Sequence, residues 1–301
     1  MADAYADRAV TLKTAIAGDP LPPGRILSSA TMPSLLAAVL EEVLPLPAMR
    51  VLQIGTGPGY LAALLAELVG DSGHVVTVEI DAALSEAART NLRDSGYKHV
   101  HCVSGDGYLG YAPEGPYDRI LATASCAEVP ASWTDQLKAD GILVLPLSLS
   151  QRASYYPMLA FKKDGSRLRG TVVPGLGRVG FLPLYGPNVV RPVLYERATS
   201  ELELAMDPHL LAASHSRSQL DGLRLVAVLE IAKRAAADWD THRSWDPGAI
   251  AWESIAAWQE ERRPTTAAFE FSLMSKGDKP IHHRWHYPKD DYDLLVSVNV
   301  K

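Results

Sequence analysis

Residues 50–69 constrain the fold of this chain more than any other stretch. Residues 50–54 are apolar enough for a buried strand and lead straight into a turn with three glycines at alternate positions. These glycines are Gly55, Gly57 and Gly59. Residues 60–69 then carry leucines at helical spacing. A strand, a glycine turn and a helix open a nucleotide-binding βαβ unit, because a side chain in the turn would keep a ligand away from the backbone and because such turns favour positive φ.

The spacing within this turn indicates the kind of nucleotide. A dinucleotide site has the pattern Gly-x-Gly-x-x-Gly and aims the following helix at a pyrophosphate. Here the pattern is Gly-x-Gly-x-Gly, and Tyr60 stands where the third glycine of that pattern is expected. The shorter spacing suits a ligand without phosphates, of which S-adenosylmethionine (SAM) is the common example.

Two acidic residues stand at matching points after the next two expected strands. Glu79 ends the strand expected at 74–79, about twenty positions beyond the glycines, where a carboxylate accepts hydrogen bonds from ribose hydroxyls. The strand expected at 100–104 is followed by Gly-Asp-Gly, which contains Asp106. Ligands bind at the carboxyl ends of the strands in open α/β sheets. Together these residues favour a SAM site over a βαβ turn that binds nothing.

Five motifs, two of which contain the turns described above, occur in a fixed order at 51–60, 105–110, 117–124, 129–130 and 141–146, with related segments at 4–9, 26–32 and 179–184. In this order the chain resembles the protein-L-isoaspartate O-methyltransferase family from about residue 4 to residue 184. The resemblance implies an α/β fold with a Rossmann-like, seven-stranded, SAM-binding sheet. It also implies methylation of a carboxylate on an aspartyl or isoaspartyl residue of a peptide.

The resemblance implies cofactor-binding roles for particular residues. In this set are Gln53, Gly55, Thr56, Gly57, Gly59, Tyr60, Glu79, Ile80, Gly105, Asp106 and Gly107. By position, Glu79 holds the ribose, and Asp106 with Gly107 holds the adenine. Gln53 stands where the family usually has an acidic residue that helps to hold the methionine ammonium.

Ser28 falls on the family's active-site serine, and the implied substrate-binding residues are Ser28, Ser29, Thr31 and Leu182. We interpret Ser28 as a hydrogen-bond donor that positions the carboxylate. Its alternative role is to cap a helix beginning near Thr31, which Ser29 or Thr31 could also do. Leu182 lies on the strand that closes the family's catalytic domain, whose backbone helps to hold the substrate.

The chain is expected to form two domains. Residues 1–187 form the catalytic domain, and residues 188–301 form an α+β extension that is a candidate substrate-recognition module. The family's N-terminal helical region is largely missing, and about 115 residues follow Leu184 without a match. We expect a loop at 1–25, a helix at 33–44 and a hairpin from 159–162 and 168–173. The extension is expected to contain helices at 200–211, 220–238 and 250–260 and an antiparallel meander at 267–273, 281–287 and 294–300.

Composition excludes several classes of function. A net charge of −6 argues against a nucleic-acid-binding surface, and no apolar run approaches the roughly 20 residues that span a bilayer. Cys102 and Cys126 sit in apolar contexts and favour free thiols and a cytoplasmic location. The expected strand sends His282 and His286 to one face and His283 to the other, with no acidic or cysteine ligand adjacent, so no metal site is predicted. Five of the six tryptophans lie in the extension and serve either core packing or peptide binding.

The sequence therefore predicts a SAM-dependent carboxyl O-methyltransferase acting on aspartyl or isoaspartyl side chains of a polypeptide. The added extension favours the tailoring of one genetically encoded peptide, in which an aspartyl methyl ester leads to a succinimide. The alternative is general repair of isoaspartyl residues in damaged proteins. Two further alternatives are a SAM-binding regulatory or scaffold protein and an O-methyltransferase for a small molecule.

Overall fold

The computed structural model describes residues 6–19, 23–149, 156–176, 179–189, 225–226, 229, 254, 257, 266–275, 285–288 and 292–298. The chain divides into two compact units. The first comprises Met1–Ser125, Val129–Leu145 and Phe181–Val190, and the second comprises Cys126–Glu128, Pro146–Gly180 and Arg191–Lys301. The predicted domain division at residue 187 stays a prediction.

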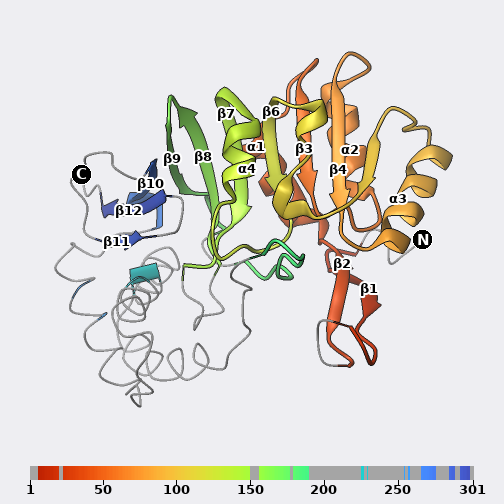
Figure 1. Ribbon diagram of the computed structural model, residues 1–301, viewed down its shortest axis with the longest axis horizontal. Helices are drawn as coiled ribbons and strands as arrows, with labels where there is room; N and C mark the ends of the chain where they lie inside the picture. The colour runs from red at the N-terminus through yellow and green to blue at the C-terminus, as the bar shows by residue number, and fades with distance from the viewer. Residues whose placement is uncertain are drawn as a thin grey trace. The chain divides into compact units, whose positions relative to one another are not determined.

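The first unit is built on five parallel strands in the order β7-β6-β3-β4-β5 (Figure 1). Their bounds are β3 Arg50–Ile54, β4 His74–Glu79, β5 His101–Ser104, β6 Tyr117–Ala122 and β7 Leu137–Pro146. The inner strands β3 and β6 are buried almost throughout, as expected of strands that are covered on both faces. Because the strands are parallel, the carboxyl ends of β3, β4 and β5 meet at one edge.

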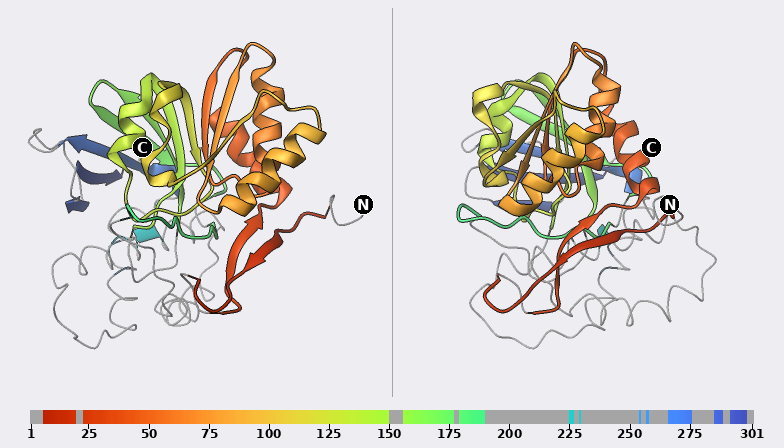
Figure 2. Two further views of the ribbon diagram at one scale, coloured as in Figure 1. Left: turned by 45° about the vertical axis from the view of Figure 1, so that its right-hand side comes forward. Right: turned by 90° about the vertical axis from the view of Figure 1, so that its right-hand side faces the viewer.

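Helices cover both faces of this sheet. They are α1 Pro33–Val43, α2 Tyr60–Val69, α3 Ala82–Asp94 and α4 Ala131–Gln136. In Figure 2, α4 lies on the opposite face from α1 and α2. This follows from right-handed crossovers. Helix α2 connects β3 to β4 on one side of the sheet centre, whereas α4 connects β6 to β7 in the opposite direction along the sheet. Short 3₁₀ helices, Gly107–Leu109 (η2) and Ala112–Glu114 (η3), connect β5 to β6.

A two-stranded antiparallel hairpin precedes the sheet, formed by β1 Val10–Thr14 and β2 Ile26–Ala30. The prediction of a loop over residues 1–25 was therefore wrong for β1. The prolines and the glycine at positions 20–24 of the sequence favour a loop, whereas Val10-Thr11-Leu12 alternates apolar and polar residues as strands do.

The second unit contains five antiparallel strands in the order β8-β9-β10-β12-β11. Their bounds are β8 Met158–Asp164, β9 Arg167–Val172, β10 Phe269–Ser275, β11 Trp285–Pro288 and β12 Tyr292–Val298. The hairpin of β8 and β9 confirms the prediction made from residues 159–173.

The predicted order of the C-terminal strands was wrong. A meander would place β11 in the middle, whereas β12 lies between β10 and β11, and β10 pairs with β9. Apart from the β1–β2 hairpin, the described residues thus hold ten strands, five parallel and five antiparallel. These are more than the seven of the predicted sheet, because the extension adds strands to the β8–β9 hairpin.

Most of the three helices predicted in the extension lies outside the described residues, although residues 225, 226, 229, 254 and 257 are helical. His282 and His283 also lie outside them, so the predicted lack of a metal site there stays a prediction. No helix among the described residues is long and apolar enough to cross a bilayer.

Candidate functional site

The glycine turn between β3 and α2 has the geometry that its sequence predicts. Gly55, Gly57 and Gly59 have φ of 89°, 54° and 89°, in the region that L side chains rarely adopt. A Cβ on Gly55 would lie 3.0 Å from Thr123 Oγ1, and one on Gly59 would lie 3.1 Å from a Leu92 carbon. The turn therefore favours glycine by conformation at all three positions, and by space as well at Gly55 and Gly59.

Glu79 fixes this turn to the neighbouring strand. The backbone N–H groups of Thr56 and Gly57 both donate to Glu79 Oε2 at 3.1 Å, and Asp81 N–H donates to Oε1 at 3.3 Å. The hydroxyls of Thr56 and Thr77 form a buried hydrogen bond of 2.8 Å beneath them. Burial raises the pKa of the Glu79 carboxyl, against the lowering effect of these N–H donors. A buried carboxylate thus stands at the point where the sequence predicts the ribose.

Gln53 lies one residue before the end of β3 and is 1 % exposed. Its Nε2 donates to the carbonyl of Gly55 at 2.6 Å, which ties the strand end to the turn. Its Oε1 is buried and has no hydrogen-bond partner among the described residues. A buried acceptor without a donor costs free energy, so this oxygen suits a ligand that brings an N–H group.

The turn after β5 lies at the same edge. Gly105 N–H donates to the carbonyl of Glu79 at 2.9 Å, so this turn continues the ladder between β4 and β5. A Cβ on Gly107 would lie 2.7 Å from Ile54 Cγ2, which explains the glycine there. Asp106 caps η2 by accepting the N–H of Tyr108 at 2.9 Å. Ile80 and Leu109, 44 % and 52 % exposed, present apolar side chains after β4 and β5.

The β1–β2 hairpin lies against the glycine turn. An ideal Cβ on Gly57 would be 3.7 Å from the Ser29 carbonyl oxygen and 3.9 Å from Leu12 Cδ1. Lys13 forms an ion pair with Asp81, the residue that caps α3. Sequence reasoning missed Leu12 and Lys13. The alternation of residues 10–12 could have revealed the strand, but nothing local pointed to a partner 68 positions away.

Ser28 lies in β2 with 8 % exposure, beside Ser29. The alternative role of Ser28, Ser29 or Thr31 as a helix cap was wrong. The N-cap of α1 is Met32, which has no capping side chain, and the Ser34 N–H of the first turn donates instead to Asp7 Oδ1 at 2.9 Å.

The segment after residue 180 returns to this unit. Ser125 N–H donates to the carbonyl of Leu182 at 2.8 Å, and Leu184 N–H donates to the carbonyl of Ser125 at 2.9 Å. The predicted substrate-binding residue Leu182 is thereby held beside the end of β6. Its predicted role, like those of the other site residues, stays a prediction.

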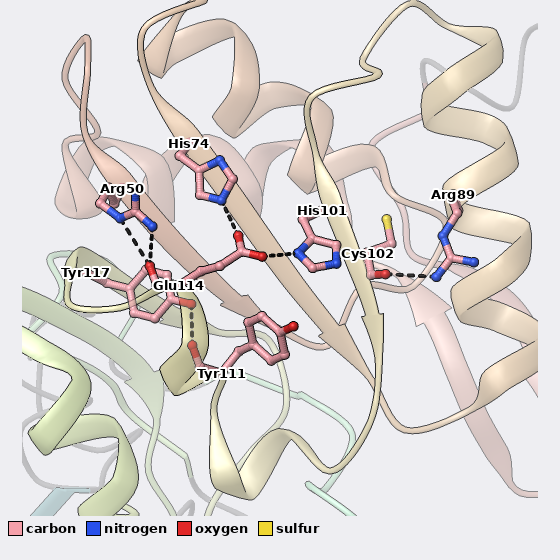
Figure 3. Close-up of polar contacts among 8 residues, drawn as sticks. All are labelled: Arg50, His74, Arg89, His101, Cys102, Tyr111, Glu114 and Tyr117. Atoms are coloured by element: carbon pink, nitrogen blue, oxygen red, sulfur yellow. Dashed lines mark hydrogen bonds and ion pairs between the residues drawn. The ribbon is translucent and has the colours of Figure 1, made fainter.

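A second polar cluster lies at the opposite edge of the sheet, where the strands begin. The Glu114 carboxylate binds both His74, at the start of β4, and His101, at the start of β5 (Figure 3). Arg50 Nε donates to the Glu114 carbonyl at 3.1 Å, and Tyr117 OH donates to the Tyr111 carbonyl at 2.6 Å. These contacts join the starts of β3, β4 and β5 to η3, and the start of β6 to the residue before η3. They lie at the other end of the strands from the glycine turn, and we assign them to stability.

Known proteins share this architecture. The sequence profile of the family described as Protein-L-isoaspartate(D-aspartate) O-methyltransferase (PCMT) matches residues 4–186. Protein-L-isoaspartate O-methyltransferase 1 of Archaeoglobus fulgidus is 39% identical over 127 residues, which are 42% of this chain and 55% of that protein. The Methanopyrus kandleri protein-L-isoaspartate O-methyltransferase is 45% identical over 169 residues, 54% of this chain and 74% of that protein. The chain spans about half the length of the first relatives that it matches, for example 54% of the Ignicoccus hospitalis protein.

A solved structure of a protein-L-isoaspartate O-methyltransferase superposes with a TM-score of 0.55 at 32% identity, over 68% of this chain and 58% of that one. A putative protein-L-isoaspartate O-methyltransferase from Plasmodium falciparum superposes with a TM-score of 0.50 at 18% identity, over 60% of this chain and 81% of that one, and supports the fold alone. The five-stranded parallel core, with its glycine turn, defines the Rossmann-like fold of SAM-dependent methyltransferases, as predicted. The family profile matches more than half of this chain, and the chain therefore belongs to the protein-L-isoaspartate(D-aspartate) O-methyltransferase family.

Proposed function

We propose that this chain is a SAM-dependent carboxyl O-methyltransferase for L-isoaspartyl residues in polypeptides. The observation that carries the proposal is the glycine turn held by Glu79 within a chain of this family. The relatives reported above carry the name of this activity, which favours general isoaspartate repair over the tailoring of one encoded peptide.

The residues present fit SAM. The unpartnered Oε1 of Gln53 offers an acceptor to the ammonium of its methionine part. Glu79 would accept one hydrogen bond from the ribose on Oε1, beside that from Asp81 N–H, and Ile80 and Leu109 would flank the adenine. When bound, SAM supplies an electrophilic methyl group on a positively charged sulfur.

The chain has to do little besides align and dehydrate the acceptor. A free carboxyl group has a pKa of about 4, so the acceptor is already ionised at neutral pH and needs no general base. Alignment of the reacting atoms can contribute about 7–11 kcal/mol. Ser28, nearly buried in β2 and next to the Ser29–Gly57 contact, would donate its hydroxyl to the carboxylate and hold it in line. The hairpin of β1 and β2 would exclude water from the glycine turn.

The test is methyl transfer from isotope-labelled SAM to two peptides that differ only in an isoaspartyl or an aspartyl residue, followed by mass spectrometry. We expect a methyl ester on the isoaspartyl peptide. Ser28→Ala should slow esterification, while Ser95→Ala, which changes an exposed serine after α3, should not. Binding of SAM without esterification of either peptide would refute the proposal and favour a regulatory role. Esterification of the aspartyl peptide alone would favour tailoring.

A further inference from the structure

Asp106 is held by a residue that lies outside both the family match and the glycine turns. The backbone N–H of Asn188 donates to Asp106 Oδ2 at 3.1 Å, and the Asn188 side-chain Nδ2 donates to the same oxygen at 2.9 Å. The two residues are 82 positions apart and belong to the same compact unit. The profile of the family ends at residue 186, so the resemblance assigns no role to Asn188.

These contacts leave the Asp106 carboxylate with little spare acceptor capacity. A carboxylate offers about four acceptor positions, two on each oxygen. Asn188 fills those of Oδ2, and the N–H of Tyr108 fills one on Oδ1 at 2.9 Å. Among the residues that the structure describes, these donors leave one position, on Oδ1. The carboxylate is therefore fixed in rotation and can accept one further donor.

Gly186 packs directly against the Asp106 carboxylate. A Cβ at this position would lie 2.3 Å from Asp106 Oδ1 and 2.5 Å from its Cγ, too close for any side chain. Val189 N–H donates to the Gly186 carbonyl at 3.2 Å and closes residues 186–189 into a turn around the carboxylate. The turn thus clamps Asp106 through the backbone of Gly186 and through Asn188.

We propose that Asn188 is a positioning residue that sets Asp106 to read the exocyclic amino group of the cofactor's adenine. This inference rests on the proposed function. Both acceptor positions of Asp106 Oδ2 are filled, so the position that remains on Oδ1 can take one N–H donor. The exocyclic amino group of adenine supplies such a donor. A carbonyl oxygen in the same place would face a carboxylate oxygen and be repelled. Asn188 therefore controls the preference for adenine over a 6-oxo purine, as well as affinity.

The experiment measures binding by calorimetry of S-adenosylhomocysteine and of its inosine analogue, S-inosylhomocysteine, to the full chain. The wild type should prefer the adenosine compound. Asn188→Ala should weaken its binding by about tenfold, the cost of releasing a hydrogen-bonded charged group, and should reduce the preference over the inosine compound. Asn188→Asp has the same size but cannot donate, and it should weaken binding further because two carboxylates then face each other.

Tyr97→Phe serves as the matched control, because it removes an exposed hydrogen bond to a different acidic side chain, Glu67. It should bind both compounds as the wild type does. If Asn188→Ala and Asn188→Asp bind the adenosine compound within twofold of the wild type, or weaken both compounds equally, the inference is wrong although the proposed function stands. If the wild type itself binds neither compound, the proposed function fails and the inference fails with it.

Discussion

Removing the Glu79 side chain tests whether this residue supports the glycine turn as well as a ligand. Glu79→Ala deprives three backbone N–H groups of their acceptor, those of Thr56, Gly57 and Asp81. Thr56 is 2 % exposed, so water cannot replace the carboxylate at its N–H, whereas Gly57 and Asp81 are partly exposed. The structural role therefore predicts a measurable loss of stability in the absence of any ligand.

The magnitude follows from the one fully buried donor. An unsatisfied buried N–H costs about 1–3 kcal/mol, and relief of carboxylate burial offsets part of it. We expect Glu79→Ala to lower the free energy of unfolding by about 2 kcal/mol, which corresponds to a Tm decrease of about 4–8 °C. Glu79→Gln keeps an acceptor and should lose less than about 1 kcal/mol.

The difference in stability between the wild type and Glu79→Gln should depend on pH. Burial raises the pKa of Glu79 in the folded state, so its contribution to stability is present below its unfolded pKa and declines as pH rises through the folded pKa. Glutamine does not titrate. The stability of the wild type relative to Glu79→Gln should therefore be greater at pH 4 than at pH 7.

The assay is urea unfolding of the ligand-free protein, followed by circular dichroism. Glu86→Ala is the control, since it removes an exposed carboxylate paired with Arg89 and should change stability by less than about 0.5 kcal/mol. If Glu79→Ala unfolds at the same urea concentration as the wild type, the turn does not depend on this carboxylate and the reasoning is refuted.

Three other changes test separate parts of the structure. Gly59→Ala should cost about 1–2 kcal/mol of strain at φ 89° plus a contact with Leu92, and should unfold earlier than Gly96→Ala, where φ is 96° and no atom lies within 4 Å. Burial raises the pKa of Glu114, but hydrogen bonds from its two histidines outweigh burial and lower it. Its stabilising effect is present above the unfolded pKa and lost as pH falls through the folded pKa, so Glu114→Gln should flatten the acid side of the stability profile. Burial raises the pKa of the Cys126 thiol, so iodoacetamide at pH 8 should label it only after unfolding, as mass spectrometry would show.

Each of these three predictions would be contradicted by a specific result. Equal unfolding of the two alanine variants would remove the packing argument at Gly59. An unchanged acid profile in Glu114→Gln would mean that the carboxylate titrates alike in both states. Rapid labelling of Cys126 in the native protein would show that its surroundings open readily.

The local parts of the site were predictable from the sequence. The glycine turn depends on backbone conformation and close contacts within a few residues of Gly55 and Gly59, and such requirements are visible in residue type. Glu79 was also predictable in place, because a parallel sheet brings the ends of successive strands together. Its hydrogen bonds to the turn were not predicted, since they depend on how two strands end relative to each other.

Contacts over long sequence separations were not predictable. Lys13 and Asp81 are 68 positions apart, and Asp106 and Asn188 are 82 apart, so no spacing rule links either pair. The predicted position of β12 in the sheet was wrong for a related reason. Alternating residues show that a strand exists but do not show which neighbour it pairs with, and chain order suggested a meander.

The central place of β12 has a consequence for synthesis of the protein. β10 and β11 leave the ribosome before the strand that both of them pair with, so until residues 292–298 emerge, β11 lacks its partner and one edge of β10 is unpaired. Open edges of this kind recruit other chains. Messages cut short before codon 292 should therefore yield products that precipitate or depend on chaperones, even though every residue of the glycine turn has been translated.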